Sequence, residues 1–422
     1  MTMEPQTGQR KARAIKPTTT ATSIELFTGG GGLAIAMHQA GFKHLAVNEF
    51  AKRACETLRS NEAIDVARPG TRMSGVPTAA AAAKAKKWPL LEGDVREISF
   101  SGWSGKVDVV AGGVPCQPFS LGGAHKGHLD ERNLWPDFER VVRETRPRVL
   151  LGENVKGLTR PSFAPYWQYV LRSLRAPFES RRTSESWEDH DKRLVKALRR
   201  AGDPSERYDV EAHVVNAADY GVPQVRWRVF VVGIRQDEAL EWSFPEATHS
   251  RQALRQAQVD GSYWDEHHLP HDPTKAIPSS DPDGDLIRWQ TLRDAIHDLP
   301  EPIEGVESSV WLHHRGHPGA RIYAGHTPNE LDKPAKTVKA GVHGVPGGES
   351  VLRKDDGTIR YLTVRETARI MTFPDTWKLE GPRGEQMRQL GNAVPVRLGR
   401  AVADSVVSAL RAKSGGGVAT HG

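Results

Sequence analysis

Short apolar runs alternate with helix-length stretches between Ser23 and about Ile234. The runs are SIELF, HLAVNEF, VDVVAGG, RVLLGEN and RVFVVGI, and the stretch LAIAMHQAGF has helical periodicity. Parallel strands that helices cover on both faces are typically continuous apolar runs of this kind. The pattern therefore predicts an α/β fold with an open sheet of parallel strands.

Two stretches interrupt the alternation. Pro69 to Lys87 contains an alanine run, Ala79 to Ala83, for which we expect a surface loop or a short helix. Arg175 to Arg207 is highly charged, and we expect it to add a solvated helix outside the sheet. Neither stretch carries a chemical signal.

The alternation is lost after Gln236, where segments rich in Pro, Gly, His and Asp follow. Helical periodicity returns in TVRETARIMTF and in VRLGRAVADSVVSALRAK, whose apolar stripe suits a helix that closes back onto the first domain. The predicted organisation is a flexible basic tail (1–22), a first domain (23–235), a smaller irregular domain (236–362), a hinge and motif region (363–391), a returning C-terminal helix (392–412) and a flexible tail (413–422).

The positive charge is unevenly distributed. The chain of 422 residues has 58 basic and 52 acidic residues, a net charge of +6. Residues 236–362 hold 13 basic and 21 acidic residues, so they carry −8 and the remainder carries +14. Since no apolar stretch approaches the ~18 residues of a membrane helix and two cysteines cannot build a disulfide framework, we expect a cytoplasmic protein with no membrane partner.

A glycine-rich turn follows the first strand. In ELFTGGGGLAIAMHQAGF the residues Gly29, Gly31 and Ala34 fit G-x-G-x-x-A, and glycine lets the backbone approach a ligand at a helix N-terminus. Glu49 ends the second strand, where a carboxylate can accept hydrogen bonds from ribose, and Asp94 marks a third strand end. These residues predict a nucleoside-binding crevice. The missing G-K-[ST] argues against a P-loop, whereas an NAD enzyme stays open.

Cys116 lies directly after a predicted buried strand, between Pro115 and Pro118. The two prolines fix two φ angles and remove two donors, so the loop has few conformations and presents the thiol to the crevice. A free cysteine more often packs as a small hydrophobe, and this interpretation holds for Cys55.

Further polar residues follow at the strand ends. Glu153 ends RVLLGEN, and Gln224, Arg226 and Arg228 stand at the start of RVFVVGI. Each alone is typical of a surface residue. Their combination with Cys116 at one sheet edge indicates an active site.

These motifs together resemble those of the DNA (cytosine-5) methyltransferases of the bacterial restriction-modification type. The matching segments, in family order, are FTGGGG (27–32), NEF (48–50), GDV (93–95), GGVPCQPFS (112–120), ENVKGL (153–158), NAADYGVPQVRWRVFVVG (216–233), RYLTVRETARIMTFPDTW (360–377) and QLGNAVP (389–395). The resemblance implies a Rossmann-like S-adenosylmethionine-dependent sheet in 23–235 and a target recognition domain in 236–362. It also implies that the protein is a monomer, that double-stranded DNA is its partner, and that a cognate restriction endonuclease can act separately.

The resemblance implies a mechanism for methylation of a flipped-out cytosine. Cys116 is the nucleophile for C6, and Glu153 acts near N3, which requires a raised pKa if it donates a proton. Arg228 contacts O2, while Arg226 is the weaker candidate and supports Glu153 or the loop. The base that removes the C5 proton is not identified.

The resemblance also implies the binding residues. Phe27 and Phe50 flank the adenine, and the cofactor residues are Phe27, Thr28, Gly29, Gly31, Gly32, Glu49, Phe50, Asp94, Val95, Pro115, Asn392, Ala393 and Val394. A lid at Leu121 to Asn133 is expected to close over the flipped base, and the DNA contacts are Gln117, Ser120, Lys126, Lys336, Thr337 and Lys339. Ten of the 17 histidines lie in 236–362 without clean ligand spacing, so no metal is expected.

Two alternatives remain at this point. A related lineage methylates transfer RNA, but it has a Cys-Phe-Thr signature that this chain lacks. A catalytically silent DNA-binding relative would have no need to keep Cys116, Glu153 and Arg228 together. The sequence leaves open which DNA sequence is recognised and which cytosine in it is methylated.

Overall fold

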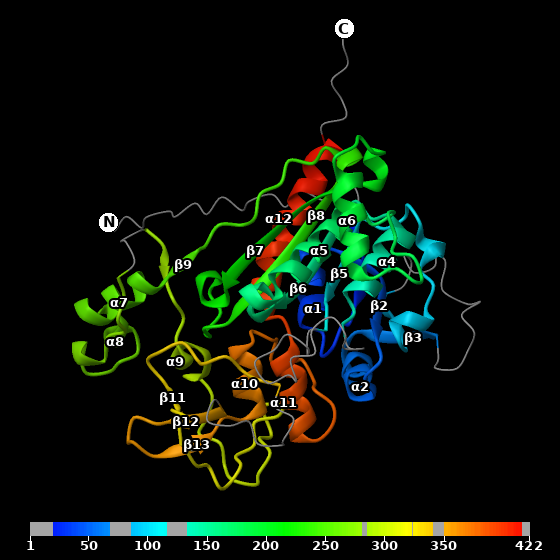
Figure 1. Ribbon diagram of the computed structural model, residues 1–422. Coiled ribbons are helices and arrows are strands. Elements are labelled where there is room, and N and C mark those ends of the chain that lie inside the picture. Colours follow the sequence, from blue (N-terminus) through cyan, green and yellow to red (C-terminus); the bar gives the residue numbers. More distant parts are fainter. Residues whose placement is uncertain are drawn as a thin grey trace, which may run out of the picture.

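A computed structural model describes residues 20–67, 86–115, 133–280, 285–322, 324–340 and 350–415. Its centre is an eight-stranded sheet in the order β3-β4-β2-β1-β5-β6-β8-β7 (Figure 1). The strands are β1 (Thr22–Leu26), β2 (Lys43–Glu49), β3 (Ala63–Ala67), β4 (Trp88–Glu92), β5 (Val109–Gly113), β6 (Val149–Val155), β7 (Tyr208–Asn216) and β8 (Trp227–Arg235). Strands β3, β4, β2, β1, β5 and β6 pair in parallel, so the predicted α/β fold is confirmed.

One strand departs from the prediction. RVFVVGI, expected to run parallel with the others, lies in β8, which pairs antiparallel with both β6 and β7. The connection between β7 and β8, residues 217–226, holds only a short turn of 3₁₀-helix, whereas a parallel crossover needs about a dozen residues or more. Because of this reversal, the start of β8 lies at the carboxyl end of β6, with Arg228 paired to Val155.

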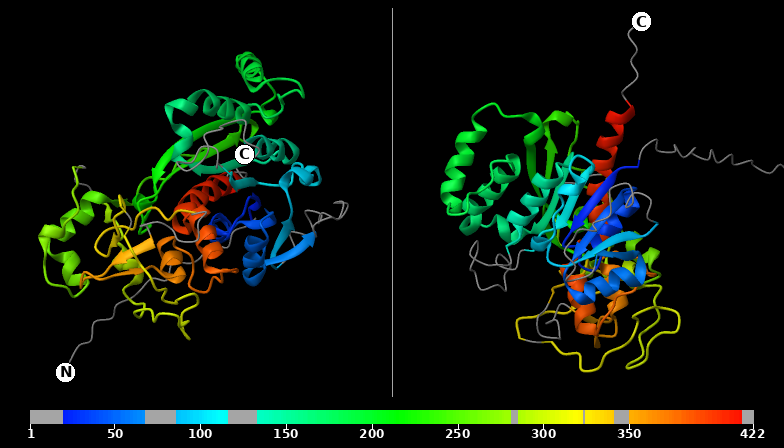
Figure 2. Two further views of the ribbon diagram at one scale, coloured as in Figure 1. Left: turned by 60° about the horizontal axis from the view of Figure 1, so that its bottom comes forward. Right: turned by 90° about the vertical axis from the view of Figure 1, so that its right-hand side faces the viewer.

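Helices cover both faces of the sheet. In the right-hand view of Figure 2 the red helix α12 lies on one side and green helices lie on the other. Helix α12 (Val396–Gly415) packs with α1 (Gly32–Ala40), and the opposite face carries α4 (Trp135–Thr145) and α5 (Ala164–Arg175). The charged stretch forms α6 (Trp187–Leu198), which packs on α5, while α2 (Lys52–Asn61) lies beside β3 and β4.

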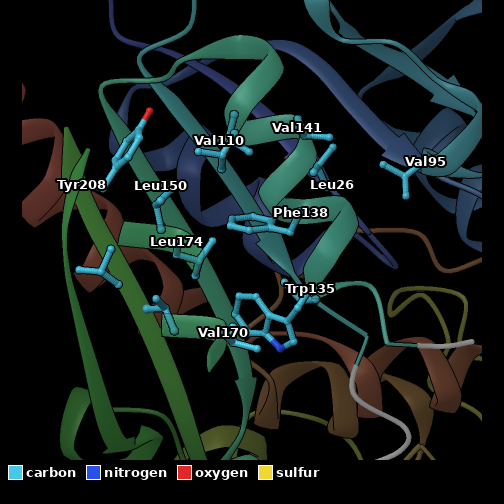
Figure 3. Close-up of a cluster of buried hydrophobic side chains, with 14 of the residues drawn as sticks. Leu26, Val95, Val110, Trp135, Phe138, Val141, Leu150, Val170, Leu174 and Tyr208 are labelled. Atoms are coloured by element: carbon cyan, nitrogen blue, oxygen red, sulfur yellow. The ribbon is translucent and has the colours of Figure 1, made fainter. Parts of the chain in front are cut away.

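The core of the α4 and α5 face is aliphatic and aromatic. Figure 3 shows Leu26 and Leu150 of the strands facing Phe138 of α4 and Leu174 of α5. These side chains are at most 1% exposed, and such burial is the main source of stability in a fold of this size. The sheet is thereby a rigid support for residues at its edges.

The described residues of 249–362 form only short elements, and these lie at the end of the molecule opposite the C-terminus (Figure 1). The helices are α7 (Arg251–Asp260), α8 (Ser262–Glu266) and α9 (Leu292–Ile296). The strands β9 (His249–Ser250) and β10 (Ile287–Arg288) form one small sheet, and β11 (Asn329–Glu330), β12 (Val351–Arg353) and β13 (Ile359–Tyr361) form another. A separate small core around Tyr263 and Trp264 holds α7 and α8.

The later part of the chain shares a core with the first strands and helices. Helices α10 (Val364–Ile370) and α11 (Arg383–Asn392) contribute to one buried cluster with residues of α1, α2 and β2. None of the described helices is long and apolar enough to cross a lipid bilayer. The shared core fixes the C-terminal segment against the turn that follows β1.

Candidate active site

Glu153 lies at the carboxyl edge of β6, next to the segment that leads to Cys116. Its main-chain carbonyl accepts a hydrogen bond from Val114 N at 3.1 Å, and Asn154 Nδ2 donates to Val114 O at 3.3 Å. Half-buried Pro115 follows, and Cys116 lies outside the described residues. The structure therefore fixes the chain just before the predicted nucleophile beside Glu153.

Glu153 forms a buried ion pair with Arg228. Arg228 Nε lies 2.9 Å from Glu153 Oε1, and the two side chains are 10% and 7% exposed. Burial raises the pKa of Glu153, although the positive charges of Arg228 and Arg226 oppose this shift. A carboxyl group with a raised pKa beside a cation suits a substrate that gains negative charge.

Arg226 has a different environment from Arg228. It is wholly buried, and its guanidinium donates to Val338 O at 2.8 Å, Gly391 O at 2.7 Å and Ala393 O at 2.9 Å. These bonds occupy the guanidinium with main-chain carbonyls of the protein. Arg226 thus holds the segments around Val338 and Gly391–Ala393 in place.

Glu49 joins the glycine turn to the second strand. Glu49 Oε2 accepts from Gly29 N at 2.7 Å, and Oε1 accepts from Phe50 N at 3.0 Å and from Ala51 N at 2.7 Å. Burial raises its pKa, and the three N–H groups act in the opposite direction. An ionised carboxylate has about four acceptor positions, so one stays available for a hydroxyl group of a ligand.

A phenylalanine follows each of the first two strands: Phe27 comes directly after β1, and Phe50 comes directly after Glu49 at the end of β2. Phe50 is 71% exposed, whereas Phe27 is half-buried and has a φ of 55°. Thr28 lies below the turn, where its Oγ1 donates to Asn48 O at 3.0 Å. An exposed aromatic ring such as that of Phe50 offers a flat apolar surface for a base.

Asp94 is held by a neighbouring arginine. Its carboxylate accepts from the main-chain N of Arg96 at 2.9 Å and from its Nε at 3.0 Å, and these contacts lower the pKa of Asp94. Val95 is buried, and its carbonyl accepts from Arg140 Nη2 at 2.7 Å. This strand end therefore presents an ionised acceptor whose position is fixed.

The C-terminal segment lies directly on the glycine turn. A Cβ placed at Gly32 would be 2.3 Å from Val394 O, and one placed at Gly31 would be 2.7 Å from the Trp377 ring. Trp377 Nε1 also donates to Gly30 O at 3.0 Å. Ala393 and Val394 are buried and Asn392 is exposed. The sequence did not single out Trp377, whose only signal is its place in a matched motif.

The predicted DNA contacts of the irregular region lie close to the start of β8. Thr337 Oγ1 donates to Val225 O at 2.7 Å, Lys336 Nζ donates to Thr327 O at 2.7 Å, and Lys339 is exposed. The other predicted DNA contacts, Gln117, Ser120 and Lys126, lie outside the described residues, as does nearly all of the expected lid. Within the described ranges, no group of three His, Cys, Asp or Glu could hold a metal ion.

Comparison with known proteins identifies the family. The sequence matches the C-5 cytosine-specific DNA methylases over residues 21–69, 77–176 and 188–408. The chain belongs to this family. It is therefore an enzyme, a DNA methyltransferase that acts at C5 of cytosine, as the sequence motifs predict.

The methylase is similar to several bacterial enzymes along most of its length. It is 32% identical to the Type II methyltransferase M.Eco47II of Escherichia coli, over 92% of this chain and 79% of that protein. It is 29% identical to the Type II methyltransferase M.NgoMIV of Neisseria gonorrhoeae, over 92% of this chain and 98% of that protein. Two solved structures have the same fold. One is a DNA modification methyltransferase from an E. coli prophage, with a TM-score of 0.55 and 20% identity, over 92% of this chain and 99% of that one. The other is the Dnmt2 methyltransferase of S. pombe, with a TM-score of 0.53 and 15% identity, over 92% of this chain and 99% of that one.

Proposed function

We propose that this methylase transfers a methyl group from S-adenosylmethionine to C5 of a flipped-out cytosine in one short duplex sequence. We further propose that it acts as a monomer and protects host DNA from a separately acting restriction endonuclease. The observation that carries the reaction is the buried Glu153–Arg228 pair beside the segment that leads to Cys116. The similarity to Type II methyltransferases supports the protective role.

The residues at the glycine turn fit S-adenosylmethionine. Glu49 keeps an acceptor position for a ribose hydroxyl, Phe27 and exposed Phe50 offer faces for adenine, and Asp94 offers an ionised acceptor for its amino group. The remaining proposed cofactor contacts are Thr28, Gly29, Gly31, Gly32, Val95, Pro115, Asn392, Ala393 and Val394. When bound, the cofactor supplies an electrophilic methyl group on a sulfonium.

The protein groups would activate the cytosine ring. The Cys116 thiolate would form a bond to C6, the C5–C6 π pair would move to C4–C5, and the C4–N3 π pair would move to N3. The resulting enamine is nucleophilic at C5. Protonated Glu153 donates to N3, and Arg228 holds O2, so both offset the charge that develops. After C5 has taken up the methyl group, loss of the C5 proton restores the C5–C6 double bond and expels the thiolate, and the proton on N3 returns to Glu153. Arg226 acts as a positioning residue, because it holds the main chain of the neighbouring segments in place through Val338, Gly391 and Ala393.

DNA binding would depend mainly on residues outside 236–362. That region carries −8 and the remainder carries +14, and phosphate contacts supply most of the sequence-independent affinity for DNA. Lys339 and the hydroxyl of Thr337 are proposed to contact DNA from the recognition side, with Lys336 supporting the same loop. Gln117, Ser120 and Lys126 are proposed to contact it from the catalytic loop. Flipping the base costs a few kcal/mol.

The test is to map 5-methylcytosine by bisulfite sequencing of both DNA and RNA from cells that express the protein. We expect complete modification of one cytosine in one short DNA motif, and none in cells that express the Cys116→Ala variant at the same level. Modification confined to RNA would overturn the DNA substrate. Modification that persists in the variant would overturn the role of Cys116.

A further inference from the structure

The recognition segment 335–340 is attached to the start of β8. Val225 N donates to Ala335 O and Ala335 N donates to Pro223 O, each at 2.9 Å. Val338 N donates to Gln224 Oε1 at 2.9 Å. The segment that carries the proposed DNA contacts is therefore in register with the strand that carries Arg228.

Arg226 links this segment to the C-terminal segment. One of its terminal nitrogens donates to Val338 O, and the other donates to both Gly391 O and Ala393 O. The residue is wholly buried, so water cannot replace a lost partner without a rearrangement. A single guanidinium thus joins two segments that are distant in the sequence.

Direct backbone contact reinforces the link. A Cβ placed at Gly391 would lie 2.4 Å from Ala340 N and 2.5 Å from the carbonyl carbon of Lys339. The main chain at Gly391 therefore rests against the recognition segment with no room for a side chain. Movement of one segment requires movement of the other.

The C-terminal segment meets the proposed cofactor site on its other side. Val394 O lies against Gly32 so closely that only glycine fits there. Residues 391–394 are thus in contact with the glycine turn through Val394 and with the recognition segment through Gly391 and Arg226.

We propose that Arg226 is a positioning residue that couples cofactor binding at the glycine turn to the conformation of the recognition segment 335–340. This inference rests on the proposed function, because it assigns the cofactor to that turn. A ligand that fixes residues 393 and 394 also fixes the guanidinium, which is planar and rigid, and with it Val338. Coupling between two sites is reciprocal, so DNA that orders the recognition segment tightens cofactor binding by the same factor.

Hydrogen exchange of the full-length protein tests the coupling without DNA. S-adenosylhomocysteine, which lacks the transferable methyl group, is added at saturation as determined by calorimetry. In the wild type we expect it to slow exchange of the Ala335 and Val338 amides at least fivefold, the lower end of typical coupling. In Arg226→Lys the ligand still binds, but slowing falls below twofold, because one ammonium cannot reach all three carbonyls.

Two further variants make the result specific. Gly391→Ala disturbs the same junction with Arg226 intact, and we expect the same loss of slowing. Arg235→Lys is the control, since Arg235 is also largely buried and donates to the Arg146 carbonyl, but it lies at the opposite end of β8 from Arg226. This control is expected to keep the fivefold response.

The outcomes are separable. If the wild type binds S-adenosylhomocysteine and the amides of 335–340 do not respond, the coupling is overturned while the proposed function stands. An equal loss of response in Arg235→Lys would show general loosening and would also overturn the coupling. If calorimetry detects no binding to the wild type, the cofactor assignment of the proposed function fails, and the coupling fails with it.

Discussion

Replacing Gly32 with alanine tests whether the C-terminal segment completes the cofactor site. The new Cβ would lie 2.3 Å from Val394 O, 3.1 Å from Ala393 Cβ and 3.3 Å from Phe373 Cζ. Ordinary contact begins at 3.4 Å, so Val394 O would have to retreat by about 1 Å. The neighbouring Ala393 O is held by Arg226, and Val396 N is held by Met371 O at 3.1 Å, so the segment cannot move freely.

The expected cost follows from this crowding. Inserting a methyl group into a well-packed position costs about 1–3 kcal/mol, and each 1.4 kcal/mol is about tenfold in affinity. We therefore expect Gly32→Ala to bind S-adenosylhomocysteine about 5- to 140-fold more weakly than the wild type. Isothermal titration calorimetry on the full-length protein measures this, with circular dichroism to show that the variant is folded.

The matched control is Gly102→Ala. A Cβ at Gly102 meets nothing within 4 Å, so this change adds the same methyl group in open space. We expect it to leave the affinity within twofold of the wild type. If Gly32→Ala also binds within twofold, the C-terminal segment does not form part of the cofactor site and the reasoning from its close approach is refuted.

Three other predictions concern titratable groups and thiols. Burial raises the pKa of Glu153, so its donated proton is lost as pH rises through that pKa. Single-turnover rates measured as a function of pH should show the ratio of wild type to Glu153→Gln falling as pH rises above the ordinary glutamate value, and a constant ratio would contradict the proposed donor. Burial also raises the pKa of Glu139 from 4.5 to about 7, so its contribution to stability is complete below pH 4.5 and is lost as pH rises through 7. Relative to Glu139→Gln, the free energy of unfolding by urea should fall by about 3 kcal/mol over that range, and parallel pH profiles would refute this. Cys55 is wholly buried and burial raises its pKa, so native Cys116→Ala protein should release no colour with Ellman's reagent until guanidinium exposes Cys55.

The sequence predicts most of the sheet and the meeting of Glu153 with Arg228, but not the direction of β8. An apolar run looks the same in a parallel and in an antiparallel strand, so only the short connection after β7 shows the reversal. Strand β7 itself was missed, because YDVEAHVVN has polar residues on its exposed side and is not a continuous apolar run. If β8 ran parallel to β6, its first residues would lie at the opposite end of the sheet from Glu153. Because β8 is antiparallel, its first residues, including Arg228, lie next to Glu153.

The environment of Arg226 could not be predicted from the sequence. Arg226 and Arg228 are two positions apart, which suggests equal exposure along a strand, yet Arg226 precedes the strand and points into the protein. Its partners are main-chain carbonyls of residues more than a hundred positions away, and a carbonyl carries no residue-type signal. Only the three-dimensional arrangement separates the two arginines into different roles.

The bond from Trp377 to Gly30 spans 347 positions, and this distance governs when the enzyme becomes competent during synthesis. A ribosome that has translated the sheet has still to produce the segment that closes over the glycine turn. Products of early termination therefore contain the proposed nucleophile but lack the segment that completes the proposed cofactor site. Each molecule can therefore complete this site only late in synthesis, after residues near 394 have left the ribosomal exit tunnel and packed against the glycine turn.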